Sequence, residues 1–396
     1  MLQEEIPVRL EEIELLFAEY TTIFPFPLGP ISVRYQNRES LSSIMPLRPA
    51  IASLSLGRPG IHDLAHKLHQ ASMHAFEGVE IFFEDLEGFA RTRNISSLVT
   101  AAQAVRSLCD DLGLAVVCLQ PLLFYEGLVC RTEHATQLRE RVPLWFDVAH
   151  ALGTDLIQVP SNFLPPDPET GLGRTTGDID TVVSDLRELA DRGAPRGFRF
   201  AYEALAWGNH VDTWEACWEI VRRVDRPNFG VCLDTFNIAA RVYADPAVAG
   251  GKTAHAEAAM RASIARMKER IDPAKIFFVQ VVDGERLVEP LVEGHEFFVP
   301  GQPSRMSWSR NARLFPFEEE RGGYLPVPDI ARAFVEELHF VDGWVSLELF
   351  SRTLADPRRD VPAEHAQRGI DSWRTLVKTL RLEDLVSEQR SAAGRL

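Results

Sequence analysis

The pattern of hydrophobic and polar positions alternates between two kinds of segment along most of the chain. Short apolar runs rich in β-branched and aromatic residues predict buried strands, and they occupy residues 50–56, 78–83, 114–120, 154–160, 198–204, 229–234, 275–282 and 344–350. Segments with apolar residues every three or four positions predict amphipathic helices, and they lie near 61–74, 95–112, 133–152, 178–192, 212–224, 254–271, 328–338 and 364–381.

Eight strands that alternate with helices predict an α/β fold, a closed (β/α)8 TIM barrel whose parallel strands are covered by helices. An open, doubly wound sheet is the alternative, and it is disfavoured because no predicted strand is followed by a G-x-G-x-x-G turn. We expect the barrel to span residues 48–383. Residues 1–47 are predicted to be an N-terminal extension with one amphipathic helix, and residues 384–396 a flexible tail.

Composition and charge narrow the class of protein. The chain has 396 residues, with 42 Lys and Arg against 57 Asp and Glu, a net charge of −15. Such an acidic chain lacks the basic surface that binds nucleic acid, and it has neither an apolar run long enough to span a membrane nor a basic, apolar secretory signal. The five cysteines form no CxxC motif, and most lie in apolar runs, which predicts buried thiols. We therefore expect a cytoplasmic protein that acts on a small molecule; its oligomeric state stays open, a homo-oligomer included.

Four polar side chains interrupt the last four predicted strands near their carboxyl ends. They are Glu203 in FAYEAL, Asp234 in VCLDTF, Gln280 in FVQVVD and Glu348 in VSLELF. The carboxyl ends of barrel strands meet at one face, so we expect these side chains to converge there. Three carboxylates and an amide oxygen suit one divalent metal ion such as Mg²⁺, Mn²⁺ or Co²⁺. The alternative is that each side chain pairs with a nearby arginine or caps a helix.

These strand-end residues resemble the metal ligands of the xylose-isomerase-like barrel superfamily. A closer resemblance, to the 3-dehydroshikimate dehydratases and particularly to the fungal enzymes of quinate and shikimate catabolism, covers about residues 48–380. It is carried by EALAWGNHVDTWEACWEIV (203–221), RPNFGVCLDTFNIAARVYADP (226–246), FFVQVVDGERLVEPL (277–291) and PSRMSWSRNARLFPFEEERGGYLPV (303–327). IASLSLGR (51–58) and GVEIFFEDLE (78–87) are similar to the opening strands of that family.

The resemblance implies a metal-dependent dehydration of 3-dehydroshikimate to protocatechuate. A metal-bound ketone would acidify the neighbouring proton, a base would remove it, and the β-hydroxyl would leave. His210, in the segment AWGNH after the fifth strand, is the first candidate for this proton transfer, and the alternative is a surface histidine that caps the next helix. Asn237 is a candidate to hydrogen-bond the substrate, at a position where some relatives carry histidine.

The carboxylate of this substrate calls for an arginine that can bind it with two hydrogen bonds. The segment RMSWSRNAR, predicted as a loop after the seventh strand, supplies Arg305, Arg310 and Arg313. We choose Arg310, with the hydroxyl of Ser307 beside it; the alternative is a structural salt bridge between Arg310 and the acidic residues 318–320.

Two further candidates follow the first two strands. Glu84 lies in EDLE, predicted as a turn, and would contact the substrate or a metal-bound water unless it is merely solvated. Arg58 follows the first strand and is a second candidate for the substrate carboxylate. The segment QPLLFYEG (120–127) is apolar where relatives often carry histidine or arginine, so a different substrate stays open.

Other functions are compatible with the same scaffold. A sugar isomerase or epimerase commonly moves its proton with a lysine or a second carboxylate, and the polar residue after the seventh strand is Asp283. A non-catalytic binding protein would be favoured by loss of a metal ligand, but all four are present. An endonuclease would need more histidines at the strand ends and a basic face.

Overall fold

Eight parallel strands close into a barrel in the computed structural model, which describes residues 47–382. The strands are β1 (Leu47–Ala52), β2 (Gly78–Phe82), β3 (Ala115–Gln120), β4 (Leu156–Pro160), β5 (Arg199–Glu203), β6 (Phe229–Asp234), β7 (Ile276–Gln280) and β10 (Gly343–Leu347). Their order around the barrel is β1-β10-β7-β6-β5-β4-β3-β2. The predicted (β/α)8 TIM barrel is confirmed, whereas the helix predicted in the N-terminal extension and the tail 384–396 lie outside the described residues.

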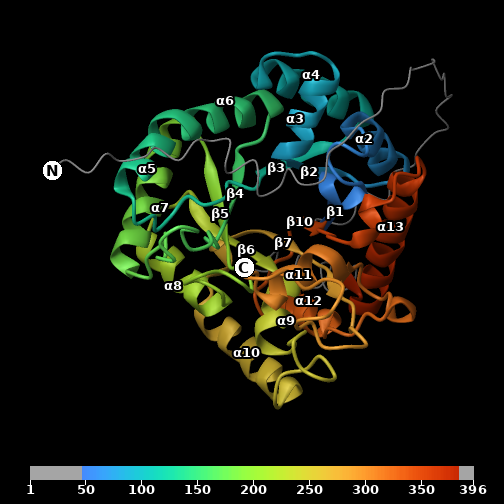
Figure 1. The fold of residues 1–396 in the computed structure, drawn as a ribbon. Helices are drawn as coiled ribbons and strands as arrows, with labels where there is room; N and C mark the ends of the chain where they lie inside the picture. The colour runs from blue at the N-terminus through green and yellow to red at the C-terminus, as the bar shows by residue number, and fades with distance from the viewer. Residues whose placement is uncertain (1–46, 383–396) are drawn as a thin grey trace, which may run out of the picture.

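Helices surround the barrel on its outer side (Figure 1). Those near predicted positions are α2 (Leu64–Met73), α4 (Leu98–Leu112), α5 (Arg131–Thr136), α6 (Val142–Leu152), α7 (Ile179–Gly193), α8 (Trp214–Val224), α10 (Ala256–Arg270), α12 (Val327–Glu336) and α13 (Val361–Leu380). No helix within residues 47–382 combines the length and the apolar character that crossing a membrane requires.

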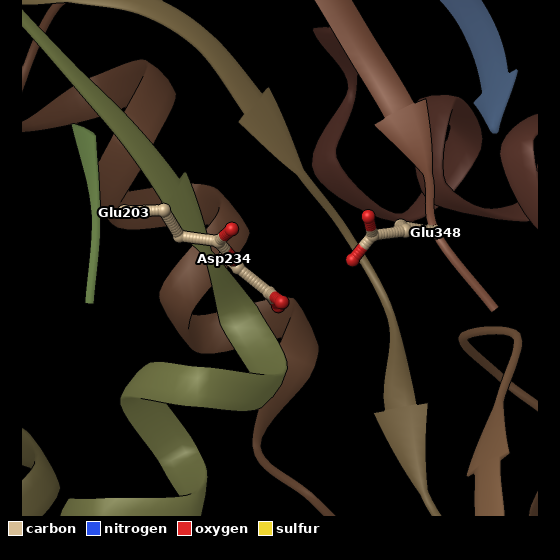
Figure 2. A group of neighbouring side chains, drawn as sticks. All are labelled: Glu203, Asp234 and Glu348. Atoms are coloured by element: carbon tan, nitrogen blue, oxygen red, sulfur yellow. The ribbon is translucent and has the colours of Figure 1, made fainter. Parts of the chain in front are cut away.

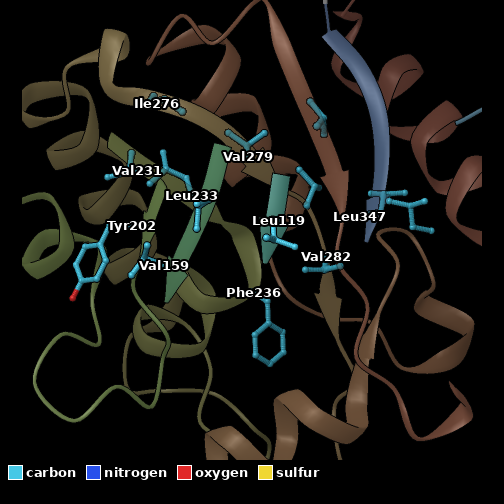
Figure 3. Packing of buried hydrophobic residues seen from close by; sticks show 14 of the residues in the cluster. Leu119, Val159, Tyr202, Val231, Leu233, Phe236, Ile276, Val279, Val282 and Leu347 are labelled. Carbon is cyan, nitrogen blue, oxygen red and sulfur yellow. The ribbon is translucent and has the colours of Figure 1, made fainter. Parts of the chain in front are cut away.

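Alternate strand residues fill two different parts of the core. One set, which includes Leu119, Val159, Val231, Leu233 and Leu347, is buried in the large cluster that joins the strands to the helices (Figure 3). The other set fills a smaller cluster of strand residues and contains Ala50, Cys118, Leu156, Ala201, Cys232 and Phe278. Because successive residues point to opposite faces and both faces are buried, the strands appear in the sequence as continuous apolar runs.

Three helices of the structure were not predicted: α3 (Phe83–Thr92), α9 (Thr235–Val242) and α11 (Ser304–Ala312). The predicted turn EDLE is therefore part of α3, and most of the predicted loop RMSWSRNAR is α11. Helices α3 and α9 begin at the residue after β2 and β6 end, so no polar segment separates strand from helix. Helix α11 is mostly polar and has no apolar stripe to reveal its period.

A second, two-stranded sheet pairs β8 (Asp283–Gly284) with β9 (Arg313–Leu314) in antiparallel orientation. Asp283 is buried and its Oδ1 accepts hydrogen bonds from the backbone N–H groups of Gly284 (2.6 Å), Leu325 (2.9 Å) and Tyr324 (3.2 Å). Arg313 is the first residue of β9, so this small sheet fixes its backbone next to β8.

All five cysteines lie in the described part of the chain as free thiols. Four of them are buried, as the sequence predicts, and Cys130 is exposed.

Candidate active site

Three carboxylates from three strands meet at the carboxyl end of the barrel. Glu203 is the last residue of β5, Asp234 is the last residue of β6, and Glu348 follows β10 directly. One oxygen of each lies within 4.8 Å of the others, and all three side chains are buried. Figure 2 shows the three carboxylates directed into the same space from their separate strands. The parallel strands thus bring together residues that are far apart in the sequence.

The start of α9 fixes two of these carboxylates. Asp234 is the N-cap of the helix, and its Oδ1 accepts a hydrogen bond from the backbone N–H of Phe236 at 2.6 Å. Asn237, one turn later, donates from Nδ2 to Oε1 of Glu203 at 2.8 Å and to Oδ2 of Asp234 at 2.9 Å. Its Oδ1 accepts from the N–H of Ala206 at 3.0 Å, so Asn237 orients the carboxylates with its whole amide.

A buried arginine that sequence analysis did not choose lies against the carboxylates. Arg313 is 1% exposed and donates from Nη1 to Oδ2 of Asp234 at 2.8 Å and to Oε2 of Glu348 at 3.2 Å. Its Nε donates to the hydroxyl of Ser309 at 3.0 Å. By contrast, Arg305 from the same segment binds the backbone oxygen of Ala240 at 2.6 Å.

Burial makes this group of charges costly without a cation. Burial and repulsion from neighbouring carboxylates raise the pKa of Glu203. Burial also raises the pKa of Glu348, although the charge of Arg313 opposes it. Burial disfavours the charged form of Arg313, but Asp234 and Glu348 outweigh this and raise its pKa. With the three carboxylates ionised, the charges −3 and +1 leave −2, which one divalent ion would neutralise.

Gln280 brings an amide to the strand position next to Asp234. Gln280 ends β7 and pairs in register with Asp234 on one side and with Ser346 of β10 on the other. Its Nε2 donates to Oε2 of Glu80 at 3.0 Å, whereas its Oε1 is buried without a hydrogen-bond partner. Amide and carboxylate oxygens are ligands of hard divalent ions. The donor set therefore fits a divalent metal, with the unpartnered oxygen as the structural sign of it.

A second polar group contains four of the predicted substrate contacts: Arg310, Glu84, Arg58 and Ser307. Burial lowers the pKa of Arg310 to about 10, and the charges of Glu84 and Arg58 act on it in opposite directions. Burial raises the pKa of Glu84, in the first turn of α3, to about 7. Arg310 donates from Nη1 to Oε1 of Gln302 at 3.0 Å, and Nε2 of Gln302 donates to the buried hydroxyl of Ser307 at 2.6 Å.

The alternative for Arg310 was a salt bridge to the acidic residues 318–320, but Glu318 of this segment binds a different arginine. Glu318 of the acidic segment 318–320 accepts two hydrogen bonds from Arg368 of α13, at 2.7 and 2.8 Å. This leaves Arg310 in the group with Glu84 and Arg58.

His210 is placed by a contact outside both groups. Its ring is exposed and lies 3.1 Å from the hydroxyl of Thr175, on the segment between β4 and α7. Among the described residues, no hydrogen bond joins it to the three carboxylates. The apolar segment 120–127 is also packed: Phe124 stacks edge-on against Phe163, with ring centroids 4.8 Å apart.

Comparison with known proteins adds to this geometry. Residues 68–376 match the family described as xylose isomerase-like TIM barrel. The chain belongs to this family. It is also 48% identical over 351 residues to a 3-dehydroshikimate dehydratase of Neurospora crassa, covering 85% of this chain and 96% of that protein. A 3-dehydroshikimate dehydratase of Pseudomonas aeruginosa is 33% identical over 84% of this chain, which spans 41% of that longer protein.

A solved structure of 31% sequence identity has the same fold. The xylose isomerase-like TIM barrel/4-hydroxyphenylpyruvate dioxygenase fusion protein superposes on 85% of this chain and 44% of its own chain, with a TM-score of 0.64 and 31% identity. The predicted resemblance is thus confirmed: this xylose isomerase-like barrel is an enzyme of the family that contains the hydro-lyase 3-dehydroshikimate dehydratase.

The interior of this xylose isomerase-like barrel contains polar residues that sequence analysis passed over. They are Glu80 on β2, Gln120 on β3, Gln158 on β4 and Ser346 on β10, all at most 1% exposed. Gln158 donates to Oε2 of Glu203 at 2.6 Å, and Gln120 donates to Oε1 of Glu348 at 3.0 Å. The same signal that indicated the ligands, a polar residue inside an apolar strand, is present at each of these positions. Glu80, Gln120 and Gln158 lie on strands before the last four, from which the proposed ligands were chosen, whereas Ser346 lies on the last strand, two residues before Glu348.

Proposed function

We propose that this protein dehydrates 3-dehydroshikimate to protocatechuate, with one divalent metal ion, Mg²⁺, Mn²⁺ or Co²⁺, held by Glu203, Asp234, Gln280 and Glu348. The observation that carries the proposal is the meeting of three buried carboxylates within 4.8 Å at the strand ends of a chain 48% identical to such a dehydratase. The buried, unpartnered oxygen of Gln280 supports the fourth ligand.

A bound divalent ion supplies Lewis-acid polarisation of a ketone oxygen. The protein's own side chains prepare the site for it: Asn237 and Gln158 hold Glu203, and Gln120 holds Glu348. Arg313 forms ion pairs with Asp234 and Glu348, and its positive charge reduces the repulsion between these two carboxylates.

The anionic end of the substrate would bind the group around Arg310. Arg310 is partly buried, and Arg58 adds a second positive charge nearby. A carboxylate that accepts two parallel hydrogen bonds from Arg310 would be desolvated and strongly held. Ser307, which is linked to Arg310 through Gln302, adds a hydroxyl on the same helix.

Two side chains are candidates to move the proton between the carbon next to the ketone and the departing hydroxyl. His210 lies on the segment after β5, and Glu84 lies beside Arg310 with its pKa raised to about 7. A group with a pKa near the working pH is suited to both accepting and donating a proton. Replacement of each by Gln, with the pH profile of kcat recorded, separates the two candidates.

The four buried free thiols support a reducing compartment, and we place the enzyme in the cytoplasm.

The test is the ultraviolet absorbance of an aromatic product. Protein treated with chelator is mixed with 3-dehydroshikimate, alone and after addition of Mg²⁺, Mn²⁺ or Co²⁺. Protocatechuate that forms only with metal supports the reaction and the cofactor together. A folded, metal-loaded protein that forms no protocatechuate would contradict the proposal and favour a sugar isomerase or epimerase of the same scaffold.

A further inference from the structure

Inside the barrel, one carboxylate contacts the neighbours of the proposed metal site. Glu80 on β2 is fully buried. Its two oxygens accept hydrogen bonds from Nε2 of Gln120 (2.8 Å), from Nε2 of Gln280 (3.0 Å), from Sγ of Cys118 (3.4 Å) and from the hydroxyl of Ser346. Four donors from three other strands thus converge on one carboxylate.

This arrangement fixes which end of the Gln280 amide faces the ligands. A carboxylate in this position accepts hydrogen bonds, so the amide must turn its NH2 toward Glu80. The amide oxygen then lies on the other side, where it is buried and has no hydrogen-bond partner. A buried polar atom without a partner is unfavourable, which makes this oxygen available to a cation.

Glu80 acts on a second proposed ligand through Gln120. The NH2 group of Gln120 donates one hydrogen to Oε2 of Glu80 at 2.8 Å and the other to Oε1 of Glu348 at 3.0 Å. The orientation of Glu348 therefore depends on the same carboxylate.

We propose that Glu80 is a positioning residue of the metal centre, which turns the oxygen of Gln280 toward the cation and holds Glu348 through Gln120. The proposal rests on the metal site of the proposed function. It predicts that metal binding depends on a hydrogen-bond acceptor at position 80 facing a donor at position 280. This pairing should matter more than a gain of one carboxylate ligand at position 280.

The experiment measures Mn²⁺ affinity by electron paramagnetic resonance of the free ion, without any substrate, in four variants: Glu80→Gln, Gln280→Glu, the double variant with both changes, and the control Glu126→Gln. Glu126 is also a fully buried carboxylate, but its oxygen accepts from the N–H of Asn162 (2.6 Å) and the hydroxyl of Tyr202 (3.1 Å). Thermal melts check that each variant is folded.

Glu80→Gln puts an amide where four donors need acceptors, so the amide of Gln280 either turns over or loses its partner. We expect a loss of Mn²⁺ affinity of about tenfold or more, the size typical of partners that orient metal ligands. Gln280→Glu also weakens binding, because the new carboxylate then faces the carboxylate of Glu80. Without this repulsion, a carboxylate would be a stronger ligand than the amide it replaces. The double variant restores a donor facing an acceptor and recovers most of the affinity, and Glu126→Gln binds as the wild type does.

Glu80→Gln with wild-type affinity would overturn the proposal. If Glu80→Gln does not fold, Gln280→Glu decides alone, and tighter Mn²⁺ binding by that variant would overturn the proposal. A wild-type protein that binds no Mn²⁺ would instead contradict the proposed metal site itself, which separates the two failures.

Discussion

A single guanidinium, that of Arg313, lies among the buried carboxylates of Glu203, Asp234 and Glu348. Its three neighbours in the segment 305–313 have different roles, since Arg305 binds backbone oxygens, Ser309 binds Arg313 itself, and Arg310 lies with Glu84. Nine residues therefore contain one structural arginine, one that balances the site and one suited to the substrate. Sequence spacing alone does not separate these roles, because it does not show which arginine is buried against which charge.

Replacement of Arg313 by methionine should destabilise the protein most when no metal is present. Removing one partner of a buried ion pair typically costs about 3–5 kcal/mol because it leaves charge uncompensated. We expect the free energy of unfolding of Arg313→Met, measured by chemical denaturation, to fall strongly in chelator and to recover in part with Mn²⁺. The control Arg305→Met should lose stability equally with and without Mn²⁺, and the same behaviour in Arg313→Met would contradict the assigned role.

The group around Arg310 makes a prediction about substrate binding. Arg310→Lys keeps the charge but loses the planar pair of donors, so the KM for 3-dehydroshikimate should rise by about 10- to 100-fold, with a smaller change in kcat. The matched control is Arg368→Lys, which changes an arginine that binds Glu318 with two hydrogen bonds outside the proposed site. An unchanged KM for Arg310→Lys would remove this residue from the site.

Loss of a metal ligand should abolish turnover and spare the fold. Glu203→Ala and Glu348→Ala each remove a carboxylate whose pKa is raised by burial, and Arg313 keeps its ion pair with Asp234 in both variants, so the barrel should still fold. We expect no metal-dependent formation of protocatechuate and a circular dichroism spectrum like that of the wild type. Full, metal-independent activity in either variant would contradict the ligand assignment. Glu219→Ala, a change on the surface of α8, serves as the control.

At the scale of elements, the sequence predicts the strands better than the segments that follow them. All eight strands were predicted because they are mostly buried on both faces and therefore mostly apolar. Helices α3 and α9 were not predicted, because Phe83 and Thr235 continue directly from the strands before them. Yet α9 is the element that makes Asp234 an N-cap and places Asn237 between two carboxylates. A helix that sequence analysis did not predict therefore orients two of the three carboxylates.

The contact between α13 and the turn Arg352–Ala355 makes a prediction about pH. His365 of α13 is buried, with Nδ1 2.9 Å from the oxygen of Val361 and Nε2 2.9 Å from the hydroxyl of Thr353. Burial, assisted by the charge of Arg368, lowers its pKa from 6.5 to about 4. Between these values the unfolded chain binds more protons than the folded chain, so this contribution to stability is complete above pH 6.5 and is lost as the pH falls toward 4.

Replacement of His365 by glutamine should therefore reduce the loss of stability in acid. Between pH 7 and 4.5, the free energy of unfolding of the wild type should fall by about 2–3 kcal/mol more than that of His365→Gln, from the size of the shift. Urea denaturation at several pH values measures this difference. The exposed His150, changed to glutamine, should leave the pH dependence as it is. Parallel curves for wild type and His365→Gln would contradict the account.

At the scale of the whole molecule, the proposed ligands come from four neighbouring strands, β5, β6, β7 and β10. Strands β2, β3 and β4 contribute the polar side chains Glu80, Gln120 and Gln158, which hold these proposed ligands from inside the barrel. The proposed site is therefore complete only in the closed barrel. Sequence analysis selected the four proposed ligands because the carboxyl ends of the strands of a barrel converge on one face. It named Arg313 only as one of three arginines and did not consider Glu80, because the partners of both side chains come from distant strands.

The most direct test is a crystal structure of this protein with Mn²⁺, recorded with anomalous scattering from the metal. We predict one anomalous peak between Glu203, Asp234, Glu348 and Oε1 of Gln280, at about 2.0–2.4 Å from the ligand oxygens, with the NH2 of Gln280 still directed at Glu80. Active, Mn²⁺-loaded crystals with the metal at another position, or with no density between these four side chains, would contradict the central claim.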